Sequence, residues 1–341
     1  MKRVHVFWFM VCLGGVFCFC SACSLGQKDY LRIVSYNVEN LFDAEHNGTE
    51  YPIFLPGKDW NQVLYQEKRA RIVAVLDMMD ADIISLQEIE NIKVLKDLGD
   101  LLDHGPYRYM SVSNFPNSAI QTGILSRYPI EAIYEHSLYV HGGTSIRGIL
   151  EAHILVDEER IAFLVNHWKS KRDGEKSAHI RAEQASLAYS RARELFRSGT
   201  ESIVILGDYN EDFTETSGAF MPLIDWDKKG IPLVHGIAVS QSVEDYTRGK
   251  FLSDVFFVTP FGSSDPGSYW YDGEWSHIDG IFLSHTMLDL YEIVEGEYMF
   301  TGDMVTREGA PRSWHRNPGL RGYSDHFPAL LVLRKKRIER D

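Results

Sequence analysis

Residues 82–89 read DIISLQEI, a short and mostly apolar stretch that carries polar Gln87 and Glu88 near its end. Such a run, rich in isoleucine and bounded by polar residues, is typical of a buried strand. Residues 59–80 precede it and carry apolar side chains at helical spacing, which predicts a helix. Residues 31–38, LRIVSYNV, predict a second buried strand that reaches Asn37. Both expected strands therefore carry a polar side chain near their end.

The middle of the chain alternates short apolar runs with turn residues. From residue 107 to residue 167 these runs are YRYMSV, TGILSRYPI, HSLYV, GILEAHILV and IAFLVNHW. They predict antiparallel strands that are close in sequence. A helix is expected from about residue 177 to residue 197, and SIVILGDYN at residues 202–210 predicts another buried strand.

Residues 211–274 are turn-rich and receive no general assignment. Near the end of this region, the pair Asp272-Gly273 stands between aromatic residues and predicts a two-residue hairpin. Residues 277–284 and 326–333 predict the last two strands.

The composition is that of one folded domain. Of the 341 residues, 44% are hydrophobic and 24% charged, and no repeat, low-complexity tract or linker divides them. We therefore expect a single domain over residues 31–335. Mixed strands with a helix after each half indicate an α/β or α+β layered sandwich.

The first residues have the layout of a secretory signal peptide. Lys2 and Arg3 precede an apolar run at residues 6–20, and small Ser21 and Ala22 follow it. The run is shorter than the ~20 apolar residues that cross a bilayer, and a retained anchor helix is the alternative. We expect residues 1–22 to be removed on export, with residues 23–30 as a tether and a periplasmic or cell-surface location in a bacterium.

All four cysteines lie at or before residue 23, so no disulfide is expected within the folded part. Cys23 follows Ser21 and Ala22 and resembles the acylated cysteine of a bacterial lipobox, although Cys20 stands where leucine is usual. A lipid on Cys23 would anchor the protein to a membrane. The alternative is plain secretion with an incidental cysteine.

The net charge of the chain limits which substrates it can bind. Removal of residues 1–22 takes away Lys2 and Arg3 and no acid, so the formal charge changes from −13 to −15. Nonspecific nucleic-acid binders usually present a basic face. The balance disfavours long DNA or RNA without excluding a local basic patch.

Polar residues interrupt or end most of the expected strands. They are Asn37, Glu88, Asn166, His167, Asp208, Tyr209, Asn210, His277, Asp279, Ser324, Asp325 and His326. Taken singly, each has an ordinary structural explanation, such as a helix cap, an Asx-turn or a buried hydrogen bond. Taken together, carboxylate and amide oxygens without cysteine are the ligands that Mg²⁺ or Mn²⁺ prefers, and histidines titrate near neutral pH.

Seven segments resemble, in order, the motifs of the endonuclease/exonuclease/phosphatase family, which includes pancreatic-type deoxyribonucleases, abasic-site endonucleases, neutral sphingomyelinases and inositol polyphosphate 5-phosphatases. They are SYNVEN, SLQE, GILSRYPI, VNHWKSK, GDYNED, HIDGIFLS and YSDHFP, and with the expected strands that carry them they run over residues 31–333. The resemblance implies a four-layer sandwich of two mixed β-sheets flanked by helices, with the site at one end of the sheets. It also implies a phosphoester hydrolase that uses Mg²⁺ or Mn²⁺, and we expect a monomer.

The resemblance assigns roles by position. Glu88 resembles the main metal-ligating glutamate, with Asn37 and Asp325 as direct or water-mediated ligands. Asp208 and Asn210 resemble the pair that orients the attacking water and holds a phosphate oxygen.

Two histidines complete the implied site. Asp279 resembles the carboxylate that hydrogen-bonds His326, and His167 resembles the second histidine of the nuclease and sphingomyelinase branches, which protonates the leaving oxygen. Phosphodiester hydrolysis needs neutralised charge, an in-line water and a proton for the leaving group. Either histidine could be the acid or the base, and Asp208 competes with His326 for the role of base.

Further charged residues have two interpretations. Glu39 either reaches a second metal ion or binds water on the first. Arg147 and the basic cluster Lys169, Lys171 and Arg172 either bind substrate phosphate or lie in solvated turns.

Three hypotheses for function follow. The first is a nuclease that cuts DNA or RNA outside the cytoplasm, suggested by the two histidines. The second is a phosphodiesterase or phosphatase acting on lipid headgroups or on inositol or nucleotide phosphates, suggested by export and by the charge of −15; the aromatic hairpin at residues 269–275 would then touch lipid or pack on the core. The third is a non-catalytic surface binding protein on the same scaffold.

Overall fold

The structure is a computed structural model that describes residues 29–55, 58–116, 118–140, 143–215, 219–222, 237–240, 255–262 and 266–337. The expected signal peptide, Cys23 and all but the last two residues of the expected tether lie outside these ranges. Within them, no helix has the length and apolar character needed to cross a membrane.

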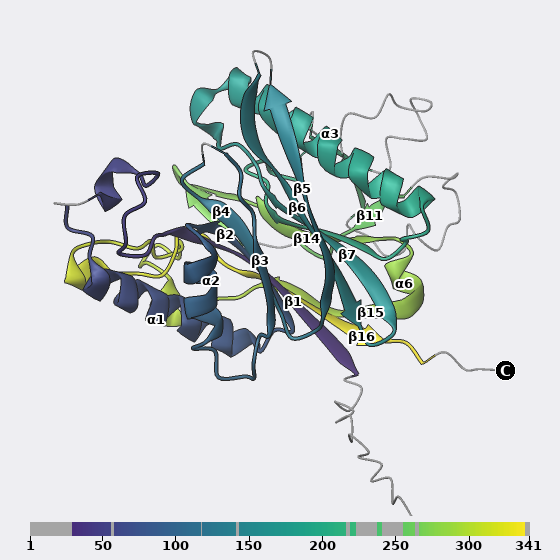
Figure 1. Cartoon of the computed structure of the whole chain (residues 1–341), viewed down its shortest axis with the longest axis horizontal. Coiled ribbons are helices and arrows are strands. Elements are labelled where there is room, and N and C mark those ends of the chain that lie inside the picture. Colours follow the sequence, from purple (N-terminus) through teal and green to yellow (C-terminus); the bar gives the residue numbers. More distant parts are fainter. Residues whose placement is uncertain are drawn as a thin grey trace, which may run out of the picture.

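Two mixed β-sheets form the centre of the molecule (Figure 1). The first has the strand order β15-β16-β1-β2-β4-β3. Its strands are β1 (Tyr30–Leu41), β2 (Ile83–Ile89), β3 (Tyr109–Val112), β4 (Gln121–Ser126), β15 (Tyr291–Tyr298) and β16 (Ala329–Lys335). β1 is parallel to β2 and antiparallel to β16, so the first and last described strands are neighbours.

The second sheet has the order β5-β6-β7-β8-β14-β11-β10-β9. Its strands are β5 (Ile130–Val140), β6 (Thr144–Val156), β7 (Glu159–His167), β8 (Ile203–Asp208), β9 (Phe220–Pro222), β10 (Ile237–Ser240), β11 (Phe257–Val258) and β14 (Asp279–Ser284). β7 and β8 are parallel, whereas β14 is antiparallel to β8.

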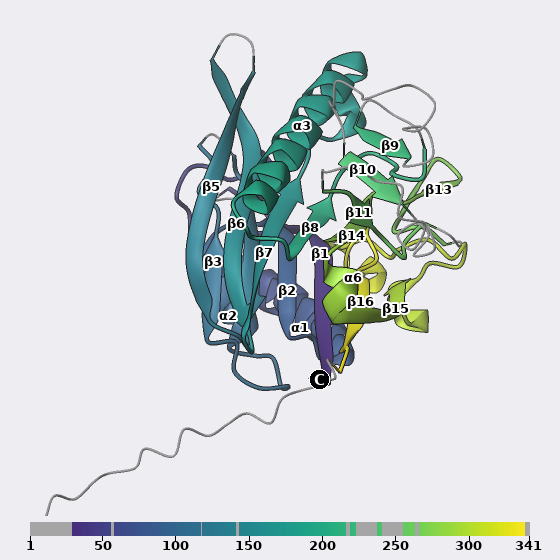
Figure 2. The ribbon, with the colours of Figure 1, turned by 90° about the vertical axis from the view of Figure 1, so that its right-hand side faces the viewer.

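The two sheets face each other, with β1 and β2 against β8 and β14, and helices cover their outer sides. α1 (Gln62–Met79) packs on β1 and α2 (Ile92–Gly99) on β3 and β4, while α3 (Glu175–Arg197) runs along the second sheet (Figure 2). Short helices are α6 (Met287–Leu290) and the 3₁₀ turns Pro52–Phe54, Lys171–Asp173, Gly302–Met304 and Pro318–Leu320. The predicted four-layer sandwich of two mixed sheets flanked by helices is confirmed.

Most expected elements lie within a few residues of their predicted bounds, but α2, α6 and β15 were not predicted, and β9, β10 and β11 lie in the region that received no assignment. α2 is only eight residues long, too short for a periodic pattern to stand out, and β15 is a strand with one face largely exposed. The expected strands of residues 107–167 also divide between the sheets, because β3 and β4 join the first and β5 to β7 the second. Adjacent antiparallel strands give the same sequence pattern whether or not the chain changes sheets between them.

The predicted hairpin is confirmed. β12 (Tyr269–Tyr271) pairs with β13 (Glu274–Ser276) in a separate two-stranded sheet. Asp272 and Gly273 join them with φ angles of 50° and 89°, and two successive left-handed residues are what a tight hairpin turn requires.

A buried charge cluster ties α3 to the second sheet. Glu151 of β6 is fully buried, and its carboxylate accepts two hydrogen bonds, of 2.6 and 2.9 Å, from Arg191 of α3. The Nε2 atoms of His136 and His153 lie 2.7 and 2.6 Å from the same carboxylate. Burial raises the pKa of Glu151, but the bonds with Arg191 and the two histidines outweigh it, and the net pKa lies well below the ordinary value.

Candidate functional site

Strand pairing brings the predicted polar residues to one end of the two sheets. In the second sheet, His167 at the end of β7 lies opposite Asp208 at the end of β8, and Asp208 lies opposite Asp279 at the start of β14. In the first sheet, Asn37 and Glu88 lie toward the carboxyl ends of parallel β1 and β2. A site at the carboxyl ends of parallel strands is a common arrangement in sheets covered by helices.

Gly207 allows β7 and β8 to pair closely just before the site. It has a φ angle of 142°, and a Cβ atom added there would lie 2.0 Å from the carbonyl oxygen of Asn166. Only glycine fits both the space and the backbone conformation. This approach sets His167 directly beside Asp208.

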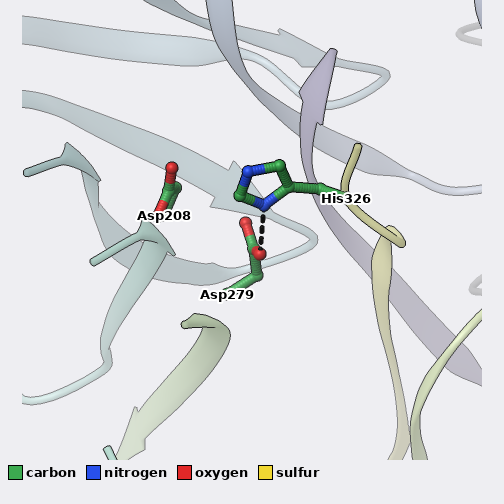
Figure 3. Close-up of side chains that lie close together, drawn as sticks. All are labelled: Asp208, Asp279 and His326. Carbon is green, nitrogen blue, oxygen red and sulfur yellow. Dashed lines mark hydrogen bonds and ion pairs between the residues drawn. The ribbon is translucent and has the colours of Figure 1, made fainter. Parts of the chain in front are cut away.

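Asp279, His326 and Asp208 meet at the centre of the site (Figure 3). His326 Nδ1 lies 2.7 Å from Asp279 Oδ2, which fixes the orientation of the imidazole ring. Burial lowers the pKa of His326, but the charges of Asp279 and Asp325 raise it more, and the net pKa is well above the ordinary value. The protonated, oriented form of His326 is therefore favoured.

Asp208 is held by amide groups. Its Oδ2 accepts hydrogen bonds from the side chains of Asn37 (2.9 Å) and Asn210 (3.0 Å), and its Oδ1 accepts one from the backbone N–H of Asn210 (2.8 Å). Burial first, and the charge of Asp279 second, raise the pKa of Asp208 to about 7. A carboxyl group fixed in this way and titrating near neutral pH is suited to proton transfer.

Bulges in β1 and β2 position Glu39 and Glu88. The pairing shifts register between Asn37 and Leu41, with Glu88 alone opposite the extra residues, and shifts again where β2 pairs with β4. Glu39, Asn40 and Glu88 all have left-handed backbones, with φ angles of 53°, 58° and 65°. Such bulges re-aim side chains and are frequent next to active sites.

A buried lysine supports the bulge in β1. Lys68 of α1 is almost completely buried, and its ammonium group donates to the carbonyl oxygens of Glu39 and Asn40. The carboxylate of Glu39 accepts a hydrogen bond of 2.7 Å from the backbone N–H of Trp314. Glu39 is thus held on both its backbone and its side chain.

The charges of Glu39, Glu88 and Asp325 fit a divalent cation. Burial first, and the charge of Asp325 second, raise the pKa of Glu88 and bring that of Glu39 to about 8. Asp325 is partly exposed, and its Oδ1 lies 3.8 Å from His326 Nε2. The charge of Asp325 destabilises the charged forms of Glu39 and Glu88, and the three carboxylates form a hard-oxygen set whose charge Mg²⁺ or Mn²⁺ would neutralise.

A second group could in principle hold a metal ion. Single oxygen or nitrogen atoms of Asp208, Asp279 and His326 all lie within 4.8 Å of one another. However, His326 Nδ1 is already bonded to Asp279, and Asp208 accepts three hydrogen bonds from amides. We therefore regard this group as proton-transfer machinery and Glu88 as the centre of the metal site.

His167 lies beside Asp208, which also neighbours His326, and it differs from His326 electrostatically. Its Nε2 is 3.6 Å from Asp208 Oδ2 and 3.7 Å from Glu88 Oε1. Burial first, and the positive charge of Arg147 second, lower its pKa well below the ordinary value. Two titratable groups with pKa values pushed apart can take opposite roles as acid and base.

The predicted basic residues differ in position. Arg147 donates to the carbonyl oxygens of His167 (3.3 Å) and Trp168 (3.2 Å), so its guanidinium borders the site. Lys169 pairs with Asp173 at 2.8 Å instead, and Lys171 and Arg172 are exposed on the following turn. Of the four predicted basic residues, Arg147 is therefore the one that borders the site.

Sequence analysis missed three neighbours of the site, namely Lys68, Tyr51 and Tyr269. A lysine in an amphipathic helix has an ordinary explanation as a surface residue. Tyr269 and Tyr51 come from the hairpin and from a loop, and only the tertiary structure brings them close. The predicted hairpin was the one available signal for Tyr269.

Comparisons with known proteins identify the family of the chain. The model of the Endonuclease/Exonuclease/phosphatase family matches residues 32–335. No curated protein sequence matches the chain.

Solved structures share the fold at low sequence identity. Truncated TDP2 of Caenorhabditis elegans is 14% identical, with a TM-score of 0.53 over 89% of this chain and 97% of that one. The mannosyl-6-phosphatase Bt3783 of Bacteroides thetaiotaomicron is 18% identical, with a TM-score of 0.54 over 89% and 99%. The human Nocturnin catalytic domain with bound sulfate is 12% identical, with a TM-score of 0.54 over 91% and 96%.

Proposed function

Because the chain belongs to the endonuclease/exonuclease/phosphatase family and is a phosphoesterase, we propose that it is an exported phosphodiesterase of nuclease type that uses Mg²⁺ or Mn²⁺. The observation that carries this proposal is the pair of histidines, His326 bonded to Asp279 and His167 beside Asp208. A phosphodiester has an alcohol leaving group that needs a proton, and a second histidine can supply it.

Glu88, Asn37 and Asp325 would hold the cation, and Glu39 would either reach a second cation or bind water on the first. A bound Mg²⁺ or Mn²⁺ supplies Lewis-acid stabilisation of the negative charge on the phosphate oxygens. Asn37 also links this part of the site to the proton-transfer groups, because its amide donates to Asp208. A shift of Asn37 would therefore disturb both the cation site and the hydrogen bonds of Asp208.

Asp208 and His326 would act on the attacking side. Asp208, held by Asn37 and Asn210, orients a water molecule in line with the phosphorus and accepts its proton. His326, held by Asp279, donates a hydrogen bond to a phosphate oxygen. Each proton-transfer group is typically worth about 10²- to 10⁴-fold in rate.

His167, which its lowered pKa leaves neutral in the free protein, would pass to the leaving oxygen the proton that Asp208 takes from the attacking water, and Arg147 beside it would bind a phosphate oxygen. His167 is buried, and its Nε2 lies near the carboxylates of Asp208 and Glu88. A proton on Asp208 therefore has a short path to His167. Lys169 and Arg172 are weaker candidates for phosphate contacts, since Lys169 already pairs with Asp173.

The location is a separate part of the proposal. It rests on the signal-peptide pattern of residues 1–22 and on Cys23, which would carry a lipid anchor. The mass of the N-terminal peptide of the mature protein tests both, because acylation of Cys23 adds a lipid mass and plain secretion does not.

A phosphatase or phosphodiesterase acting on lipid headgroups or small phosphates is the second candidate. The formal charge of −15 after removal of residues 1–22 favours it, since such a surface repels long polyanions.

A panel assay separates the two candidates. Plasmid DNA, RNA, sphingomyelin vesicles and inositol and nucleotide phosphates are each incubated with the protein and Mg²⁺, Mn²⁺ or Ca²⁺. Cleavage of nucleic acid supports the nuclease. Intact nucleic acid together with hydrolysis of a small ester or a lipid replaces it with the second candidate.

Glu88→Gln should weaken Mn²⁺ binding by at least about tenfold, because even residues that only orient a metal ligand contribute about 10- to 100-fold. Glutamine keeps the size of the side chain and removes its charge. Titration calorimetry measures the affinity directly. The control is Glu292→Gln, because Glu292 lies on β15 and forms an exposed ion pair with Arg334 of β16. Equal Mn²⁺ affinity of the two variants would remove Glu88 from the metal site.

A further inference from the structure

The hairpin of β12 and β13 is attached directly to the catalytic histidine. Tyr269 pairs with Ser276 across the hairpin and also forms an antiparallel bridge with His326. Residues directly opposite each other in antiparallel strands project from the same face. Tyr269 and His326 therefore share a face, and Tyr271, two residues further on, shares it too.

The tryptophans lie on the other face and anchor the hairpin. Trp270 contacts Trp275 edge-on, with ring centroids 5.1 Å apart, and Trp275 stacks on Phe327 at 5.8 Å. Phe327 in turn stacks on Phe300 at 4.7 Å. Of the two roles considered for this aromatic hairpin, packing on the body of the protein accounts for Trp270 and Trp275.

The tyrosines extend the catalytic face outward. The ring of Tyr269 lies 4.8 Å from that of His326 at an interplanar angle of 37°, and the ring of Tyr271 lies 6.5 Å from that of Tyr269 at 8°. This last spacing matches the ~6.6 Å between alternate side chains on a strand. Tyr271 is 71% exposed, so the row of rings leads from the catalytic histidine to solvent.

Burial and the carboxylates of the site also raise the pKa of Tyr269, the tyrosine that lies closer to His326. Burial first, and the charges of Asp325 and Asp208 next, raise the pKa of Tyr269 to about 12. Among the described residues, no hydrogen bond holds the hydroxyl group of Tyr269 or Tyr271. Neither tyrosine is therefore committed to a structural hydrogen bond.

We propose that Tyr269 and Tyr271 form a stacking platform for the nucleobase of the nucleotide that carries the reacting phosphate. This inference rests on the proposed phosphodiesterase function and names the group that the site takes beside the phosphate. Near-parallel, exposed tyrosine rings on a strand bind bases through their π-faces and do so with little sequence preference. Binding through π-faces needs no basic surface, which suits a chain of formal charge −13.

The test compares two ligands that differ only in the base. AMP and ribose 5-phosphate share the phosphate and the sugar, and their dissociation constants are measured by calorimetry in Mg²⁺. Wild-type protein should bind AMP more tightly. Tyr271→Ala should weaken AMP binding by roughly 5- to 150-fold, the typical contribution of one stacked base, and leave ribose 5-phosphate unchanged.

Two further variants separate stacking from damage to the fold. Tyr271→Trp should retain AMP binding, because tryptophan also stacks. Tyr30→Ala removes another exposed tyrosine, seven residues before Asn37 on β1 and so about 23 Å from the site, and should bind both ligands as wild type does.

Equal affinities for AMP and ribose 5-phosphate, or unchanged AMP binding by Tyr271→Ala, would overturn the platform. So would a Tyr271→Ala protein that loses only its binding to sphingomyelin vesicles, which would assign the hairpin to lipid. Hydrolysis in the panel assay is scored separately, so an active enzyme without base preference refutes the platform alone. Base-selective binding without hydrolysis refutes the phosphodiesterase alone.

Discussion

Asp279→Asn should lower kcat by about 10²- to 10⁴-fold while the protein stays folded. Asp279 accepts the hydrogen bond from His326 Nδ1 at 2.7 Å and supplies the negative charge that stabilises the imidazolium. Asparagine has no charge, and its amide nitrogen favours the tautomer in which Nδ1 is the acceptor. Steady-state hydrolysis of whichever phosphoester the panel identifies measures the loss.

An independent measurement follows the histidine itself. In the Asp279→Asn protein, the pKa of His326, followed by NMR, should fall toward or below its ordinary value, because the charge that raised it is gone while burial remains. Asp303→Asn, on an exposed turn, is the matched control. Full activity of Asp279→Asn would remove the Asp279–His326 pair from the mechanism.

Glu151→Gln should destabilise the protein by about 3–5 kcal/mol, the typical effect of removing one partner from a buried ion pair. Arg191 would lose the buried one of its two carboxylate partners and keep the exposed Glu194, and the side chains of His136 and His153 would lose their shared acceptor. Urea unfolding measures the free energy. Glu131→Gln breaks the exposed pair with Arg160 in the same sheet and should cost at most about 1 kcal/mol.

The lowered pKa of Glu151 also determines how the free energy of unfolding should depend on pH. Its folded-state pKa lies below the unfolded value, so its stabilisation is complete above the unfolded pKa of about 4.3 and is lost as the pH falls below that value. Between pH 7 and pH 3, the wild-type protein should therefore lose more stability than Glu151→Gln. Equal losses in both proteins would show that Glu151 does not govern acid unfolding.

The chemistry of the site could be predicted because it lies at the ends of strands. SLQE and GDYN are polar interruptions of apolar runs, and a buried strand tolerates a carboxylate where the chain turns, where a ligand binds or where charged partners hold it, as they hold Glu151. Asp208, Asp279 and His326 therefore stood out by residue type, and the structure brings all three together.

Other features depend on tertiary structure that no local pattern encodes. The left-handed backbone at Glu88 arises from a register shift between two strands some 50 residues apart, and nothing in SLQE signals it. Lys68 occupies a helical position that suits a surface lysine, yet α1 directs it onto the bulge of β1. The division of five similar strands between two sheets is likewise decided by packing.

The pairing of β1 with β16 has a consequence for when the enzyme becomes active. Tyr30 to Ser35 pair with Arg334 to Ala329, and Asp325 and His326 lie just before β16. A nascent chain that still lacks these last strands has Asn37 and Glu88 but neither Asp325 nor His326, and its first strand has no antiparallel neighbour. The site that we assign is therefore assembled only once residues 325–335 have been made and β16 has paired with β1.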